Sequence, residues 1–137
     1  MFFKKDNNKA EANFLTKVCA LLIHAAKIDE NYTQNEETII KKTLIELGSS
    51  KEDLSKTIKD AKIIEENSNQ ILDFTKEVKN LTEKDKIKIV EALWSIVYSD
   101  KDANIYEANL MRRLAGLLYI DNKTMGDIKD KIKNQNL

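Results

Sequence analysis

The stretch from Ile87 to Ile120 constrains the fold most, because its pattern is that of a helix, an acidic turn and a second helix. Apolar residues cover the first helix on more than one side, at Ile87, Ile89, Val90, Ala92, Leu93, Trp94, Ile96, Val97 and Tyr98. An apolar surface of this width is typical of a helix buried among several others. The rest of the chain must therefore supply helices that surround it.

Composition favours an all-α fold in a single compact domain. The chain has 137 residues, no proline, three glycines, 42% hydrophobic and 34% charged residues. A chain of this length can bury roughly two thirds of its unfolded surface without a disulfide or a metal. We expect residues 1–10 to form an N-terminal extension and residues 11–137 to form the helical domain.

Apolar spacing and capping residues predict about seven helices. They run from Glu11 to about Lys27, from Thr33 to about Leu47, from Ser50 to about Glu66, from Ile71 to about Val78, from Thr82 to the acidic turn, from Asn104 to Leu118 and from Asn122 to about Lys133. Thr33 with Glu36 matches the spacing of a capping box, and Gly48 is placed to end the second helix.

The charge balance and the single cysteine exclude several classes of protein. The formal net charge is zero, so no overall field favours nucleic acid. A lone Cys19 in an apolar helical run excludes an intramolecular disulfide and favours the cytoplasm. We expect no transmembrane segment. Phe2 and Phe3 could contact a membrane peripherally or a partner; the alternative is a helix extension packed on the core.

An internal repeat aligns the two halves of the chain. Placing Asp29 over Asp100 gives both halves the pattern D-x-[ND]-x-[TN]-x-x-E between apolar helices. The same register places Ile39 over Leu110 and Leu47 over Leu118, so the apolar faces also coincide. We infer two helical hairpins related by a pseudo-twofold axis and joined by the third and fourth helices.

These residues resemble the two halves of a tellurite-resistance TerB-like domain. The resemblance rests on CALLIHAAKIDENYTQNEETII and EALWSIVYSDKDANIYEANLMRRLAGLLYI, and it spans about residues 12 to 130. It implies an all-helical module associated with resistance to tellurite and other stresses, related to the N-terminal part of a membrane-anchored J-domain co-chaperone. It also implies that acidic turns bind a divalent metal, calcium above all. Where the family has a glycine after each aspartate, this chain has Glu30 and Lys101.

Alternating oxygen ligands make the turns candidate calcium sites. The candidate ligands are Asp100, Asp102, Asn104 and Glu107 in the second turn, and Asp29, Asn31 and Glu36 in the first. Alternate side chains in a tight turn can converge on one hard cation. Ile105 and Met111 stand where an EF-hand needs glycine and a bidentate acid, so an EF-hand is excluded. A site with so few carboxylates should bind calcium weakly, on the order of 0.1 mM or poorer.

A metal-independent interpretation explains nearly the same acidic residues. Asn104 with Glu107 can cap one helix as Thr33 with Glu36 caps another, and the aspartates then lie near positive helix ends. The chain would in that case be a helical adaptor for an unknown protein partner, working through an apolar patch or through Arg112 and Arg113. Both hypotheses stay open.

The remaining motifs do not indicate an enzyme. The sequence contains no glycine-rich phosphate loop, no Ser-His-Asp set and no paired-histidine motif. Cys19 and the single histidine, His24, lie roughly 140° apart around a helix, so we expect them to have packing or surface roles. Trp94 and Tyr98, one turn apart, should fill space between helices. The oligomeric state has no signature in the sequence.

Overall fold

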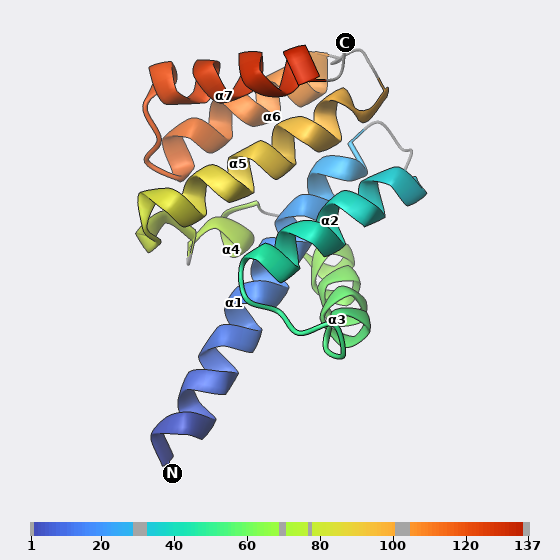
Figure 1. Cartoon of the computed structure of the whole chain (residues 1–137), viewed down its shortest axis with the longest axis vertical. Helices are drawn as coiled ribbons and strands as arrows, with labels where there is room; N and C mark the ends of the chain where they lie inside the picture. Colours follow the sequence, from blue (N-terminus) through green and yellow to red (C-terminus); the bar gives the residue numbers. More distant parts are fainter. Residues whose placement is uncertain (1, 29–32, 69–70, 77, 101–104, 136–137) are drawn as a thin grey trace.

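The computed structural model describes the backbone of residues 2–28, 33–68, 71–76, 78–100 and 105–135, and the side chains of residues 14–28, 33–68, 71–76, 78–99 and 107–135. All regular elements in these ranges are helical (Figure 1). They are α1 (Phe2–Ala26), α2 (Gln34–Glu46), α3 (Leu54–Asn67), α4 (Leu72–Thr75), η1 (Val78–Asn80), α5 (Glu83–Val97), η2 (Tyr98–Asp100), α6 (Ile105–Leu117) and α7 (Asn122–Gln135). The predicted all-α fold is confirmed.

Helices α1 and α5 form the centre of the molecule. Every residue from Val18 to Ile23 has an exposed fraction of 1% or less, so this part of α1 is buried on all sides. α5 buries Ile89, Val90, Ala92, Leu93, Trp94, Ile96 and Val97, as its wide apolar surface predicted. α1 packs against α2, α3, α4 and α5, and α5 also packs against α2 and α7.

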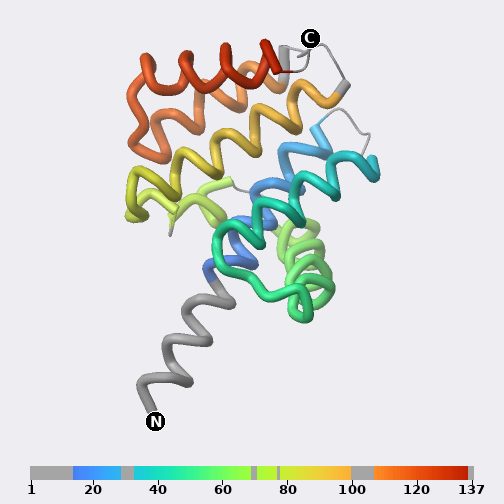
Figure 2. The backbone as a smooth tube through the Cα atoms, in the orientation of Figure 1, coloured from blue at the N-terminus to red at the C-terminus, as the bar shows by residue number. Residues whose placement is uncertain are grey.

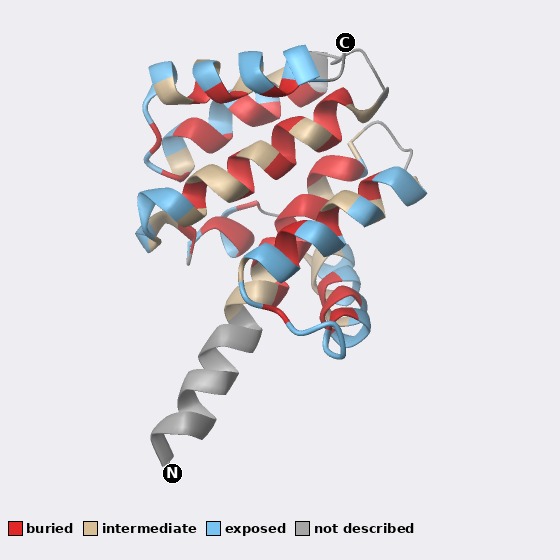
Figure 3. Ribbon diagram, viewed as in Figure 1, coloured by how far each residue is buried: buried red, intermediate tan, exposed pale blue. Residues whose placement is uncertain are grey.

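The outer helices are amphipathic and turn their charged sides to solvent. α7 buries Met125, Ile128 and Ile132 and leaves most of its other positions exposed. Figure 3 shows the same division in α3, whose outward surface is exposed while its inner side meets α1. Figure 2 follows the path of the backbone, and in it α1 and α5 run their C-terminal ends toward the same side of the molecule.

Local hydrogen bonds fix the helix starts. Thr82 Oγ1 accepts a hydrogen bond from Asp85 N at 3.3 Å and caps α5 as predicted. At the third helix, Asp53 N donates to Ser50 Oγ at 3.3 Å, but residues 51–53 form a turn and α3 begins at Leu54. The predicted start at Ser50 was therefore early, because its hydroxyl stabilises the turn that precedes the helix.

Two other helix boundaries differ from the prediction. α1 begins at Phe2 rather than Glu11, since no proline or glycine interrupts the residues between them and the helix can propagate through polar positions. The predicted fourth helix is divided into α4 and the 3-10 turn η1. This segment is short, so its shape is set by packing against α1 rather than by its own propensity.

Helices α2 and α6 end in the same way. Gly48 follows α2 with a φ of 113°, and Ser49 N donates to Leu44 O at 2.9 Å. Tyr119 follows α6 with a φ of 56°, and Ile120 N donates to Ala115 O at 2.9 Å. Both are Schellman endings, and the predicted repeat pairs these residues in register. The two helices therefore share the geometry of their C-terminal ends; the repeat and its pseudo-twofold relation stay predictions.

Candidate functional site

The described part of the first acidic turn is a helix cap. Thr33 Oγ1 accepts from Glu36 N at 3.3 Å, and Glu36 Oε1 accepts from Thr33 N at 3.0 Å. This reciprocal pair is the predicted capping box, and Glu36 is 2% exposed. Asp29 and Asn31, the other candidate ligands of this turn, lie outside the described residues.

The second acidic turn is described only at its edge. Glu107, in the first turn of α6, is 4% exposed and so matches Glu36 in burial as well as in register. Asp102 and Asn104 lie outside the described residues, and for Asp100 only the backbone at the end of η2 is described. Within the side chains that are described, no group of three or more histidine, cysteine, aspartate or glutamate residues could hold a metal ion.

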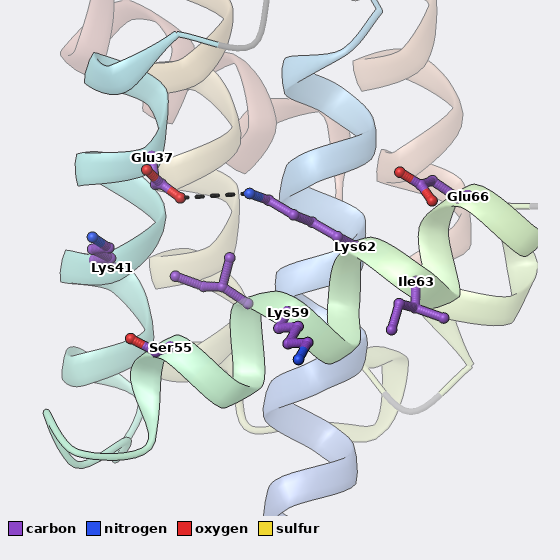
Figure 4. A pocket seen from close by; sticks show the side chains of 8 residues that line it. Glu37, Lys41, Ser55, Lys59, Lys62, Ile63 and Glu66 are labelled. Atoms are coloured by element: carbon purple, nitrogen blue, oxygen red, sulfur yellow. Dashed lines mark ion pairs between the residues drawn. The ribbon is translucent and has the colours of Figure 1, made fainter.

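A groove between α2 and α3 brings charged groups of both helices together at the surface. Its volume is about 400 Å³. The lining residues come from both helices and are Glu37, Lys41, Ser55, Ile58, Lys59, Lys62, Ile63 and Glu66 (Figure 4). Ile58 is buried beneath the groove, whereas Ile63 is 50% exposed. The groove therefore combines apolar surface with lysines on both of its walls.

One ion pair crosses this groove. Lys62 reaches from α3 toward Glu37 on α2, with Nζ 3.8 Å from Oε1 (Figure 4). Lys41 on α2 and Lys59 on α3 are exposed, and neither forms an ion pair with the described part of the chain. Because Glu37 balances part of the charge of Lys62, Lys41 and Lys59 are the lysines of the groove best placed to meet an acidic ligand.

The charge is distributed unevenly along the groove. Lys59 lies in the first half of α3, and Glu66 lies near the C-terminal end of that helix. Figure 4 shows Glu66 at the opposite end of the groove from Ser55. The lysines Lys41 and Lys59 therefore lie toward one end of the groove and the carboxylate of Glu66 lies at the other, so the two ends differ in charge.

Two neighbouring groups that could have been reactive are structural. Burial raises the pKa of the Cys19 thiol to about 12, so the thiol is protonated and poorly nucleophilic at neutral pH. His24 Nδ1 lies 3.4 Å from Glu65 Oε1, and Lys27 Nζ lies 2.8 Å from Glu65 Oε2. This arrangement raises the pKa of Lys27, mainly through its hydrogen bond to Glu65. The packing and surface roles predicted for the cysteine and the histidine agree with this geometry.

Sequence reasoning missed the groove. Ser55, Lys59, Lys62 and Glu66 recur at the spacing of one helical face, so a charged side of α3 could have been read from the sequence. The sequence did not show which helix lies next to this charged side of α3, because the position of α3 relative to α2 depends on how both helices pack around α1.

Comparison with known families identifies the chain. The model of the family described as Tellurite resistance protein TerB matches residues 15–130. The chain belongs to the TerB family. The match covers both predicted repeats and every helix from α2 to α6, so the resemblance in the two sequence runs is confirmed. No curated protein and no solved structure matches this TerB-family chain.

Family membership makes the chain a tellurite-resistance-associated module. In the parts of this TerB-family chain that the structure describes, no helix combines the length and apolar character needed to cross a membrane.

Proposed function

We propose that this chain is a non-catalytic binding module of the TerB family that holds an acidic, partly apolar segment of a partner protein in the groove between α2 and α3. The observation that carries the proposal is the arrangement of Lys41 and Lys59 on opposite walls beside exposed Ile63. Carboxylates of the partner would meet the two ammonium groups, and an apolar side chain that follows them, on the side of Glu66, would cover Ile63 (Figure 4).

The direction of the groove limits how such a segment can lie. Glu66, at the far end, repels an acidic residue and favours a lysine or arginine of the partner. A segment with acids at one end and a base at the other therefore fits in one orientation. A uniformly acidic segment should bind less well than this mixed one.

The interaction should be weak and sensitive to salt. Exposed ion pairs typically contribute about 0.2 to 1 kcal/mol each, and salt screens them over roughly 10 Å. Most of the affinity must then come from covering Ile63, and the charges set orientation and encounter rate. We expect a transient partner rather than a permanent subunit.

The proposal does not require a metal. Glu36 already accepts the N–H of Thr33 within the capping box, which favours a structural role for this acid. Calcium binding by the acidic turns is the rival hypothesis. It predicts that partner binding needs the cation, whereas a groove built by α2 and α3 should bind equally without it.

The first test is to locate the binding site of a designed peptide by ¹H–¹⁵N NMR. The probe is a short peptide with two glutamates, a leucine and a terminal arginine, and the control peptide has lysines in place of the glutamates. We expect the acidic peptide to shift the amides around Lys59 and Ile63 at low salt. The control peptide should produce no shifts there.

Matched lysine variants make this test specific. The Lys41→Gln/Lys59→Gln double variant removes the two groove lysines that form no ion pair with the described residues, and Lys42→Gln/Lys56→Gln removes two exposed lysines from the same helices outside the groove. The first should strongly weaken the shifts and the second should preserve them. Equal loss in both, or shifts centred on another surface, would refute the groove as the site.

A further inference from the structure

A second, smaller pocket lies on the other side of the molecule's core, where α5, α6 and α7 meet. It has a volume of about 190 Å³ and includes Trp94, Met111, Arg112, Met125 and Lys129 among its lining residues. Among the described lining residues only Arg112 and Lys129 are charged, so this part of the lining carries two positive charges and no carboxylate. Both methionines are buried, which gives the pocket an apolar inner wall.

Neither cation of the pocket forms an ion pair with the described residues. Arg112 is exposed and forms no hydrogen bond or ion pair that the described residues show. Lys129 Nζ lies 5.5 Å from the centroid of the Trp94 ring, so its contact in the described structure is with an aromatic face rather than an acid. A guanidinium presents a planar fork of donors that matches the two oxygens of a carboxylate.

Trp94 in the lining of this pocket is buried and has a hydrogen-bond donor that is unsatisfied among the described residues. Its indole is 5% exposed, and its Nε1 is buried without any hydrogen-bond acceptor among the described residues. A buried donor of this kind is costly and uncommon in native proteins. Tyr98 stacks on the ring, with centroids 5.8 Å apart and planes 22° from parallel, which holds the indole in place. Trp94 therefore gives the pocket a fixed aromatic wall next to Arg112 and Lys129, two cations that form no ion pair with the described residues.

We propose that this pocket binds a small organic carboxylate, with the carboxylate held between Arg112 and Lys129 and a short apolar stem against Met111 and Met125. The apolar wall favours an organic acid over a bare inorganic anion, which would leave that wall uncovered. The site is separate from the α2–α3 groove and uses none of its residues. An experiment can therefore refute carboxylate binding in this pocket without refuting partner binding in the α2–α3 groove, and the reverse.

The test uses the fluorescence of Trp94, the single tryptophan of the chain. The full chain is titrated with straight-chain carboxylates from acetate to hexanoate, with hexylamine as a probe of the same stem and opposite charge, and with inorganic phosphate. We expect a saturable change that strengthens with stem length in the carboxylates and is absent with hexylamine and phosphate.

Two adjacent arginines supply the control. Arg112→Gln should weaken hexanoate binding by about tenfold or more, and Lys129→Gln should weaken it similarly. Arg113→Gln, which changes an exposed neighbour outside the pocket, should leave binding unchanged. All three positions reach the surface, so folding should persist, and circular dichroism checks this.

The same titrations can overturn the proposal. A response to hexylamine equal to that of hexanoate would mean non-specific apolar contact. Equal binding of phosphate and hexanoate would indicate a general anion site without selection for a stem. No saturable change with any carboxylate, or unchanged binding in Arg112→Gln, would also refute the assignment.

Discussion

Gly48 and Tyr119 hold the same left-handed position at the ends of α2 and α6, although one residue has no side chain and the other has a large aromatic ring. Their φ angles are 113° and 56°. Left-handed backbone is easy for glycine and costs other residues roughly 1 to 2 kcal/mol. At Tyr119 the ring is 67% exposed, and the Nζ atoms of Lys79 and Lys86 each lie 5.8 Å from its centroid. These contacts offset part of the backbone cost.

The glycine at the end of α2 should be needed for its backbone alone. A Cβ added to Gly48 meets no atom within 4 Å, so Gly48→Ala should lower the free energy of unfolding by about 1 kcal/mol through backbone strain. Gly116, within α6, also has open space around it but no positive φ. Gly116→Ala should instead raise the free energy of unfolding by about 0.5 to 1 kcal/mol. Urea denaturation compares the two, and a loss in both variants would contradict this explanation.

Glycine should also be more stable than alanine at position 119, because this position has a positive φ. Tyr119→Gly and Tyr119→Ala both abolish the lysine contacts, so the difference between them reports only the backbone. We expect the glycine variant to be more stable by about 1 kcal/mol in thermal unfolding. If alanine and glycine are equivalent there, the left-handed geometry at the end of α6 is not maintained in solution.

The capping box of α2 should contribute measurably to stability. Thr33→Ala removes the acceptor for Glu36 N and should cost about 0.5 to 2 kcal/mol in denaturant unfolding. Thr38 lies on the exposed side of the same helix and donates only to Gln34 O. Thr38→Ala should be neutral or slightly stabilising. Equal costs at the two positions would contradict a specific contribution of the capping box to stability.

The start of α7 should make stability dependent on acid pH. Asp121 Oδ1 accepts from Thr124 N at 2.7 Å, and this bond lowers the pKa of the Asp121 carboxyl below its ordinary value of 3.8. Since the folded pKa is depressed, the contribution is complete above pH 3.8 and is lost as the pH falls through the lower folded value. Chemical denaturation from pH 5 down to about pH 2 should therefore show a shallower loss for Asp121→Asn. If stability falls equally with pH in the native chain and in Asp121→Asn, the Asp121 carboxyl does not contribute to the acid dependence of stability.

Local signals explain why the helices could be predicted from sequence. The cap at Thr33, the stop at Gly48 and the cap at Thr82 each depend on residues within one turn, and all three are present. The buried stack of Trp94 on Tyr98 followed equally from spacing alone.

Long-range packing explains what the sequence did not reveal. The α2–α3 groove joins residues such as Lys41 and Lys59 from separate helices, and the pocket beside Trp94 needs α5, α6 and α7 together. No local pattern encodes which faces meet. Arg112 was noted in the sequence as one of two adjacent arginines. The sequence did not show that it lines the same pocket as Lys129, which is what makes it a candidate ligand-binding residue.

The left-handed backbone conformation of Tyr119 could not be predicted for a different reason. Sequence rules expect glycine or asparagine at that position of a helix end, so a tyrosine gives no signal. Only its register with Gly48 in the predicted repeat could have suggested the geometry.

Isothermal titration of the acidic peptide tests the proposed function most directly. The peptide is added to the native chain and to the Lys41→Gln/Lys59→Gln variant, each in EDTA and in millimolar calcium chloride. We predict the same Kd for the native chain in both buffers, and binding at least about tenfold weaker in the variant. Unchanged binding in the variant, or binding to the native chain only with calcium, would contradict a metal-independent groove.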